Sequence, residues 1–361
     1  MRVVPIECIP EGSLLGRTIY DSNGRILLTP GTVLTNSILN KIREFKILSL
    51  YILDEYSNSE IEDIIKPELR QKAIKTLRGT FKDINRLNSV KNLGTTKNDF
   101  AKIALIAEEI VENILANKDI LVNLVDIKNL DSYTYQHSVN VAILSLALGV
   151  GLRLSKKDLL DLCLGALLHD IGKVFIPKTI IQKSNSLTNE EYDLIKTHPR
   201  KGYNYLSRYR ELHTVCKLIA LQHHEHVDGT GYPEGLKKDR INYLARIVSI
   251  ADVYDALTSD REYRKALCAS DALEYIMAYG GTIFDFDLVK VFIKIIVPFP
   301  FGTVVQLSNG DVGIVQDTPV NFPLRPSIKI LKSNNPDLEG YSIDLLKNPS
   351  LVISGLEYNR L

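Results

Sequence analysis

Residues 159–173 read LLDLCLGALLHDIGK, an apolar stretch that ends on a histidine and an aspartate. Its leucines recur at helical spacing, so the stretch predicts a buried helix. A carboxylate next to such a helix, here Asp170, cannot stay buried and unpaired at a tolerable free-energy cost. The neighbouring His169 offers an imidazole, so a metal ion is the simplest cation that balances the charge.

Two other apolar stretches carry side chains of the same kind. His137 precedes the apolar run 139–144, and Asp252 lies inside the apolar run 247–257. Single histidines of this kind are equally well explained as buried structural imidazoles. The full set is better explained as a metal site, and its remaining members are His198, His223 and His224.

The types of these residues indicate which metals they bind. Mixed imidazole and carboxylate ligands suit iron, manganese, zinc or cobalt better than magnesium or calcium. Five histidines and two aspartates exceed the needs of one ion, whereas two ions bridged by a carboxylate fit the number. Such a pair is a common device for phosphoester hydrolysis, because it activates a bridging water and neutralises charge on phosphorus. His213 and His226 lack this context, and we expect structural roles for them.

Composition limits the class of protein. A length of 361 residues predicts two or three domains, and 45% hydrophobic residues are enough for a buried core. The formal net charge of +1 gives no basic field for a nucleic-acid polymer. Four scattered cysteines fit a reducing compartment. The sequence has no secretory signal and no apolar stretch long enough to cross a bilayer, so we expect a cytoplasmic protein without a membrane span.

The pattern of elements predicts a mainly α protein with small flanking modules. Residues 1–57 mix short strands with a helix that Thr35 can cap, which predicts a small N-terminal α+β module. Residues 58–118 are expected to form a helical connector, interpreted as a spacer or a homodimer contact. Residues 119–297 are the predicted helical catalytic domain. Residues 298–361, with an Asn309-Gly310 hairpin turn, are expected to form a small C-terminal β-domain.

An ordered series of motifs resembles the HD-GYP family, a branch of the HD-domain phosphohydrolases. The matching segments are YTYQHS (133–138), HDIGK (169–173), HPRKG (198–202), HHE (223–225), DGTGYPEG (228–235) and ADVYDALTSDREYR (251–264). One histidine-aspartate pair would be weak evidence, but chance rarely repeats several unrelated motifs in order. The resemblance covers residues 119–297 and implies an HD-domain helical bundle there.

The resemblance also implies an activity and its metals. Members of the family hydrolyse cyclic di-GMP to linear pGpG and often further to GMP. Some members bind a third metal through a glutamate where this chain has Tyr133, so we expect two metals, iron or manganese. Asp170 would bridge them. The first ion would be held by His137, His169, Asp170 and Asp252, and the second by His198, His223 and His224.

Substrate contacts follow from the same resemblance. Lys173 would stabilise charge at the scissile phosphate, unless it is merely a solvated residue after a helix. Asp255 shares a helix face with Asp252, and would either orient a ligand histidine or pair with an arginine. Arg261 and Arg264 could instead complement a helix dipole. The residues implied to contact the nucleotide and its second phosphate are Tyr232, Arg261 and Arg264.

Three functions are compatible with these motifs. The leading hypothesis is hydrolysis of cyclic di-GMP. The second is hydrolysis of another cyclic dinucleotide, because the motifs specify phosphoester hydrolysis more firmly than the base. The third is a non-catalytic cyclic di-GMP sensor that acts through a signalling protein bound at the GYP loop, residues 228–235. The complete ligand set argues against the sensor, since a sensor needs no dinuclear site.

Overall fold

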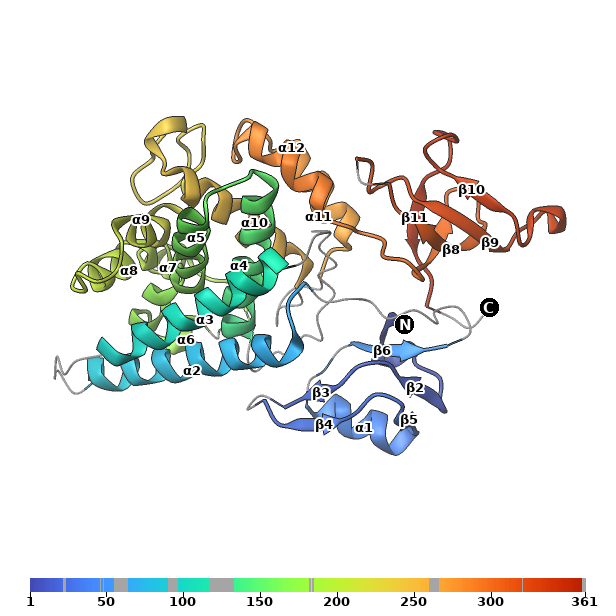
Figure 1. Cartoon of the computed structure of the whole chain (residues 1–361), viewed down its shortest axis with the longest axis horizontal. Coiled ribbons are helices and arrows are strands. Elements are labelled where there is room, and N and C mark those ends of the chain that lie inside the picture. Colours follow the sequence, from blue (N-terminus) through green and yellow to red (C-terminus); the bar gives the residue numbers. More distant parts are fainter. Residues whose placement is uncertain are drawn as a thin grey trace. The chain divides into compact units, whose positions relative to one another are not determined.

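The fold is that of a computed structural model (Figure 1). It describes residues 1–21, 24–45, 47, 49–54, 64–89, 97–116, 133–181, 183, 185–259, 266–319 and 321–358. Contacts divide the chain into two compact units. Unit 1 comprises Met1–Asp63, Asn123–Tyr133 and Ile296–Leu361, and unit 2 comprises Ile64–Val122 and Thr134–Ile295. The boundaries expected near residues 57 and 118 lie outside the described residues, so the four-part division stays a prediction.

Unit 2 is helical, and the mainly α fold class is therefore confirmed (Figure 1). It begins with two contacting helices, α2 (Pro67–Ser89) and α3 (Lys97–Ala116). The other α-helices are α4 (Tyr133–Gly151), α5 (Lys156–Leu168), α6 (Lys178–Ile181), α7 (Asn189–Ile195), α8 (His198–Leu206), α9 (Thr214–Gln222), α10 (Tyr243–Thr258), α11 (Ala269–Ala278) and α12 (Phe286–Ile295). Two short 3-10 helices complete the unit, η3 (Ile171–Phe175) and η4 (Lys238–Arg240).

Three helices of unit 2 are buried on nearly every side. In α4 every residue from 137 to 149 is buried, and most residues of α5 after Asp158 and of α10 after Tyr243 are buried too. Helix α5 packs against α3 and α9, while α10 packs against α9. A helix that is apolar all round belongs in the interior. The few polar side chains on these helices are therefore carried into the core of the unit.

The N-terminal module of unit 1 combines an antiparallel sheet with a helix, as predicted. The strand order is β1–β6–β2–β5, with β1 (Arg2–Pro5), β6 (Ser49–Leu53), β2 (Ser13–Leu15) and β5 (Val33–Leu34). Thr35 caps helix α1 (Asn36–Glu44) by accepting a hydrogen bond from the Ile38 backbone N–H. A separate pair is formed by β3 (Ile19–Tyr20) and β4 (Ile26–Leu28), and η1 (Ile6–Cys8) follows β1.

The C-terminal part of unit 1 is an antiparallel sheet of five strands. The strand order is β10–β9–β8–β7–β11, with bounds Ser342–Asp344, Ser327–Lys332, Val312–Asp317, Val304–Leu307 and Ile353–Leu356. The predicted Asn309-Gly310 turn joins β7 to β8, and Gly310 has a φ of +90°. Alternate residues such as Val305, Leu307 and Ile328 form the core. A short 3-10 helix, η5 (Pro336–Leu338), precedes β10.

The helices of the described residues differ in length and in apolar content. None of them is both long enough and apolar enough to cross a bilayer.

Candidate metal centre

The seven residues expected to bind metal come together in unit 2. Six of them are buried and His224 is half-buried. Their elements are α4 (His137), the end of α5 and the start of η3 (His169, Asp170), the start of α8 (His198), the end of α9 (His223, His224) and α10 (Asp252). Their ligand atoms form three groups, each within 4.8 Å: His198, His223 and His224; His137, His169 and Asp170; His169, His223 and Asp252.

Close packing of two backbone segments brings Asp170 to His198. Helix α5 ends at Leu168, and the chain turns into η3, which contacts α8. A Cβ atom on Gly172 would overlap the carbonyl oxygen of His198. Only glycine therefore allows η3 and α8 to approach this closely.

Hydrogen bonds to one ring nitrogen orient four of the histidines. Each acceptor is a carbonyl or carboxylate oxygen, so the imidazole Nδ1 must donate. In the neutral ring the Nε2 lone pair is then left for a metal. The acceptors are Asp255 Oδ2 for His137 (2.7 Å), the Ala166 carbonyl for His169 (2.7 Å), the Ile195 carbonyl for His198 (2.7 Å) and the Ala220 carbonyl for His223 (3.1 Å).

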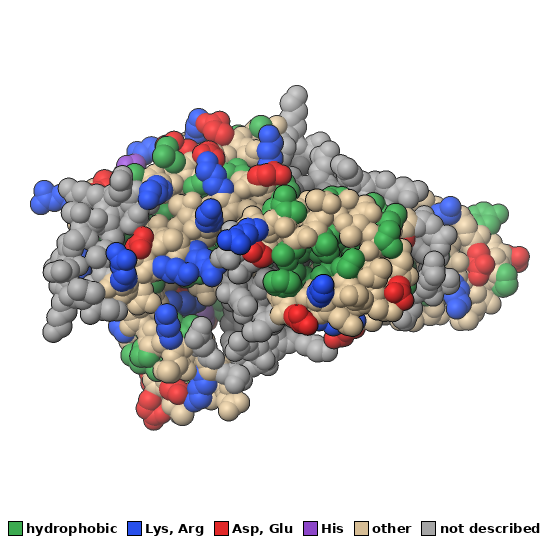
Figure 2. All heavy atoms as spheres, turned by 90° about the horizontal axis from the view of Figure 1, so that it is seen from below, with side chains coloured by type: hydrophobic (Ala, Val, Ile, Leu, Met, Phe, Trp, Pro, Cys, Tyr) green, Lys and Arg blue, Asp and Glu red, His purple; other side chains and the backbone are tan. Residues whose placement is uncertain are grey.

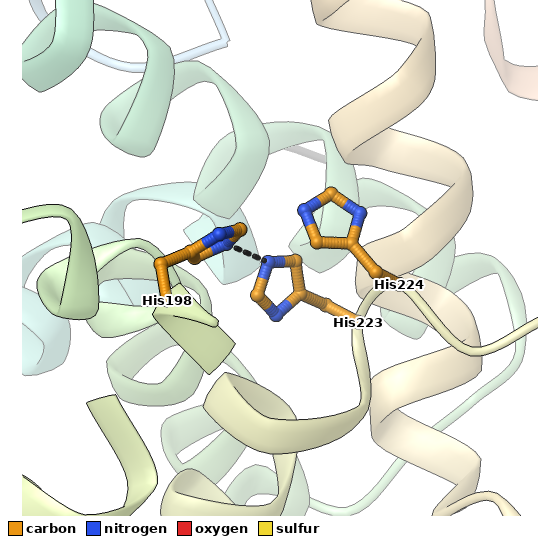
Figure 3. A group of neighbouring side chains, drawn as sticks. All are labelled: His198, His223 and His224. Atoms are coloured by element: carbon orange, nitrogen blue, oxygen red, sulfur yellow. Dashed lines mark hydrogen bonds between the residues drawn. The ribbon is translucent and has the colours of Figure 1, made fainter. Parts of the chain in front are cut away.

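Two of these rings face each other across the site. The Nε2 atoms of His198 and His223 are 3.3 Å apart, and the rings point toward one another with His224 beside them (Figure 3). Both rings donate through Nδ1, so neither neutral ring has a proton on Nε2 to share. Two facing lone pairs repel unless a cation lies between them.

The two aspartates each face histidines on two sides. Asp170 Oδ2 lies 3.4 Å from His169 Nε2, whereas Asp170 Oδ1 lies 3.3 Å from His198 Nε2. Asp252 Oδ1 lies 3.0 Å from His137 Nε2, whereas its Oδ2 lies 3.8 Å from His224 Nδ1. Each carboxylate therefore spans two groups of imidazoles.

Unsatisfied polar atoms test whether a metal fits this site. Among the described residues, His169 Nε2 and Asp170 Oδ1 are fully buried and have no hydrogen-bond partner. The 3.3 Å contact from His198 to Asp170 Oδ1 supplies no proton, because the ring donates through Nδ1 instead. Buried polar atoms are nearly always satisfied, and these two are ordinary metal-ligand atoms. The donor set therefore fits divalent metal ions.

The pKa shifts agree with a site that holds cations. Burial acts to raise the pKa of Asp170, but the Lys173 ammonium and the imidazoles around it hold this pKa well below its ordinary value. Burial lowers the pKa of His224 to about 3, so this ring is neutral at pH 7. Burial acts to lower the pKa of His137, but hydrogen bonds to Asp252 and Asp255 raise it to about 9. A proton on His137 thus balances the carboxylates, and a metal would displace it.

Comparisons with known proteins identify the family. A family model described as "HD domain" matches residues 109–288, which include all seven candidate ligands. A cyclic di-GMP phosphodiesterase of Thermotoga maritima is 30% identical over 281 residues, covering 72% of this chain and 74% of that protein. The chain belongs to the HD-GYP family. The predicted family is thereby confirmed, and a match of 281 residues is longer than the predicted helical domain, residues 119–297.

Other relatives share smaller parts of the HD-GYP chain. A cyclic di-GMP phosphodiesterase of Pseudomonas aeruginosa is 37% identical over 235 residues, covering 65% of this chain and 56% of that protein. The chain thus spans about half the length of the first curated relatives it matches. A solved HDG"Y"P protein of Bdellovibrio bacteriovorus has the same fold, with a TM-score of 0.54 and 21% identity over 81% of this chain and 97% of that one. A model described as a KOW domain associated with HD domains matches residues 304–356.

Lys173, from η3, lies against Asp170. Its Nζ is 2.5 Å from Asp170 Oδ2, and its side chain is 31% exposed. The ammonium therefore reaches from the solvent side to the carboxylate. This position suits a cation that meets an incoming phosphate.

Contacts with His224 and Glu225 hold the GYP loop in place. The Tyr232 ring stacks on His224 with centroids 4.7 Å apart, and burial raises the Tyr232 pKa, so the phenol stays neutral. The buried Glu225 carboxylate accepts hydrogen bonds from the backbone N–H groups of Glu234 (2.7 Å) and Leu236 (2.8 Å). Sequence reasoning gave Glu225 no role. Its place directly after the paired histidines was the available signal.

The remaining predicted residues lie as follows. Asp255 contacts His137, which is the orienting arrangement expected as one alternative. Arg261 and Arg264 lie outside the described residues. His213 and His226 bond to Asp161 and Thr230, apart from the three ligand groups.

Proposed function

We propose that this HD-GYP chain hydrolyses cyclic di-GMP to pGpG, GMP or both, on two divalent metal ions. The observation that carries the proposal is the placement of Asp170, whose two oxygens face different groups of imidazoles at 3.4 and 3.3 Å. The two relatives described above are named cyclic di-GMP phosphodiesterases, which supports the same substrate.

The ligands divide between the two ions as the family resemblance implies. One ion would be held by His137, His169, Asp170 and Asp252, and the other by His198, His223 and His224, with Asp170 shared. The close grouping of the last three histidines supports this division, while His223 also lies within 4.8 Å of His169 and Asp252 of the first set. Imidazole and carboxylate donors favour iron or manganese over magnesium.

The residues of the chain position the substrate for this reaction. When bound, the metal pair supplies an activated water and neutralises charge on the phosphodiester. The Lys173 ammonium binds a non-bridging phosphate oxygen and stabilises its growing charge. Tyr232 presents a flat neutral ring on which a base or ribose can pack. Arg261 and Arg264 would bind the second phosphate through bidentate hydrogen bonds.

We also propose a cellular location for this enzyme and possible partners. The four cysteines are free, which supports a reducing cytoplasm. A homodimer through the connector helices and a signalling partner at the GYP loop stay predictions.

The decisive experiment combines product analysis with metal counting. The protein is purified without oxygen, its iron and manganese are counted, and cyclic di-GMP is added. We expect about two metal ions per chain and conversion to pGpG or GMP. His198→Ala should lose metal and turnover, whereas the matched variant His213→Ala should keep both. If the protein holds metal and hydrolyses a mixed cyclic dinucleotide but not cyclic di-GMP, the proposed substrate is wrong. Cyclic di-GMP binding with neither metal nor turnover would favour the sensor.

A further inference from the structure

Helix α2 carries one buried arginine among exposed basic residues. Lys72, Lys75, Lys82 and Arg86 of α2 are exposed. Lys and Arg side chains gather on the lower face of the helical unit, the side on which α2 lies (Figures 1 and 2). Arg70 is different, because only 6% of its surface is exposed. Burying a guanidinium is costly unless it is hydrogen-bonded or paired, so its partners indicate why it is inside.

Arg70 begins a chain of hydrogen bonds that ends at the metal site. Its Nη1 donates to Asn140 Oδ1 at 2.6 Å. Asn140 Nδ2 donates to Asp255 Oδ1 at 3.0 Å, and Asp255 Oδ2 accepts from His137 Nδ1 at 2.7 Å. All four side chains are buried. The chain therefore connects α2, α4 and α10 without an exposed link.

The chemistry at both ends fixes the direction of these bonds, because the guanidinium can only donate and the Asp255 carboxylate can only accept. Asn140 must therefore turn its oxygen toward Arg70 and its NH₂ toward Asp255. With Arg70 replaced by a residue that cannot donate, the buried Asn140 Oδ1 would lose this charged donor. The amide would then shift toward another donor and weaken its hydrogen bond to Asp255. The Asp255 carboxylate in turn keeps the proton of His137 on Nδ1. His137 Nε2 is thereby held toward Asp252, 3.0 Å away.

The chain of bonds reaches outside the region that identifies the family. Asn140, Asp255 and His137 lie within residues 109–288, which match the HD model, whereas Arg70 precedes them. It is separated from Asn140 by 70 residues of sequence. Helix α2 also contacts η3, the segment that carries Lys173. The helix is thus joined to the site at two points.

We propose that Arg70 is a positioning residue of the metal site, which holds the Asn140 amide in the orientation that lets Asp255 fix His137. The proposal rests on the proposed function in that His137 is taken to bind a metal. Outer partners of metal-binding histidines typically change metal affinity by about 10–100-fold. Because Arg70 acts through two intervening side chains, we expect the lower end of that range.

The test measures metal affinity, not hydrolysis. Iron or manganese dissociation constants are determined for folded wild type, Arg70→Met and Arg70→Lys by competition with a chelator. Arg70→Met should raise the dissociation constant about tenfold, and Arg70→Lys, which keeps a donor, should recover part of the loss. Asn140→Ala leaves Arg70 in place and cuts the same chain, so it should weaken binding at least as much as Arg70→Met. It also keeps the test valid if Arg70→Met does not fold.

A matched arginine separates positioning from general stability. Arg246 of α10 is largely buried and pairs with Asp285 at 2.6 Å, and neither residue belongs to the three ligand groups. Arg246→Met should lower the melting temperature and leave metal affinity unchanged. The proposal is overturned if Arg70→Met binds metal like wild type, or if Arg246→Met weakens binding equally. If the proposed function is wrong, the protein will bind metal but will not hydrolyse cyclic di-GMP. The metal affinities of the variants would still decide the role of Arg70.

Discussion

The helical unit and the C-terminal sheet each bury an aspartate, and they balance its charge differently. Asp311, at the end of the β7–β8 turn, is 2% exposed, and Asp170 is 1% exposed. Asp311 accepts hydrogen bonds from Asn309 Nδ2 and Ser333 Oγ, both at 2.7 Å. Asp170 has Lys173 on one oxygen, while its other oxygen has no donor.

The difference shows that burial alone does not mark a functional acid. Neutral donors bind both oxygens of Asp311, so neither oxygen is left without a partner, and these bonds stabilise the turn. Asp170 instead directs an unsatisfied oxygen toward imidazole nitrogens that also lack protons. A buried carboxylate oxygen that has no hydrogen-bond donor and lies among other acceptors is the feature that indicates a cation.

The largest effect is expected from removing the charge of Asp170. Asp170→Asn keeps the size of the side chain but should lower metal content and reduce cyclic di-GMP hydrolysis by more than about 100-fold, beyond the loss of an outer partner. Elemental analysis and product chromatography measure the two quantities. Full metal content in this variant would mean that Asp170 resembles Asp311 and that the bridging assignment is wrong.

A smaller loss, confined to turnover, is expected for Lys173. Lys173→Ala removes the cation that we propose to meet the phosphate, so kcat should fall by about 10²–10³-fold, as for the loss of one electrostatic stabiliser. Metal content should not change, because the ligands remain. Loss of metal in Lys173→Ala would show that the ammonium holds Asp170 in place and does not act on the substrate.

Backbone packing at the site should respond to a single added methyl group. Gly172→Ala forces η3 away from the His198 carbonyl, which should cost about 1–3 kcal/mol of unfolding free energy and weaken metal binding. The control is Gly79→Ala on α2, where an added Cβ has no atom within 4 Å. This change should stabilise the helix by about 0.5–1 kcal/mol. Equal effects of the two substitutions would remove any special role of the close approach.

The smallest effect is expected in the C-terminal sheet. Asp311→Asn turns one acceptor into a donor that faces Asn309 or Ser333, so the sheet should lose about 1 kcal/mol of stability. Metal content and hydrolysis should stay at wild-type values. The chain has no tryptophan, so calorimetry is the suitable measurement of unfolding. A fall in metal content would contradict the structural reading of Asp311.

Sequence reasoning recovered the family and the fold class because both leave local traces. Helical spacing of apolar residues around Leu162 predicts a buried helix, and Thr35 and the Asn309-Gly310 pair mark the start of a helix and a turn. The motifs named the seven residues that meet in unit 2. The role of Asn140 could not be predicted from the sequence. The hydrogen bonds of its side-chain amide join residues that are 70 and 115 positions away, and such distant partners leave no periodic signal.

By itself, the sequence determined which residue types lie in apolar surroundings, and hence that imidazoles and carboxylates had to be buried together with a compensating charge. Only the tertiary structure decided how they are arranged. It placed the two oxygens of Asp170 toward different histidines, fixed each Nδ1 on an acceptor, and brought Arg70 of α2 to Asn140. These are properties of distance and direction between helices, which packing sets and which local sequence does not contain.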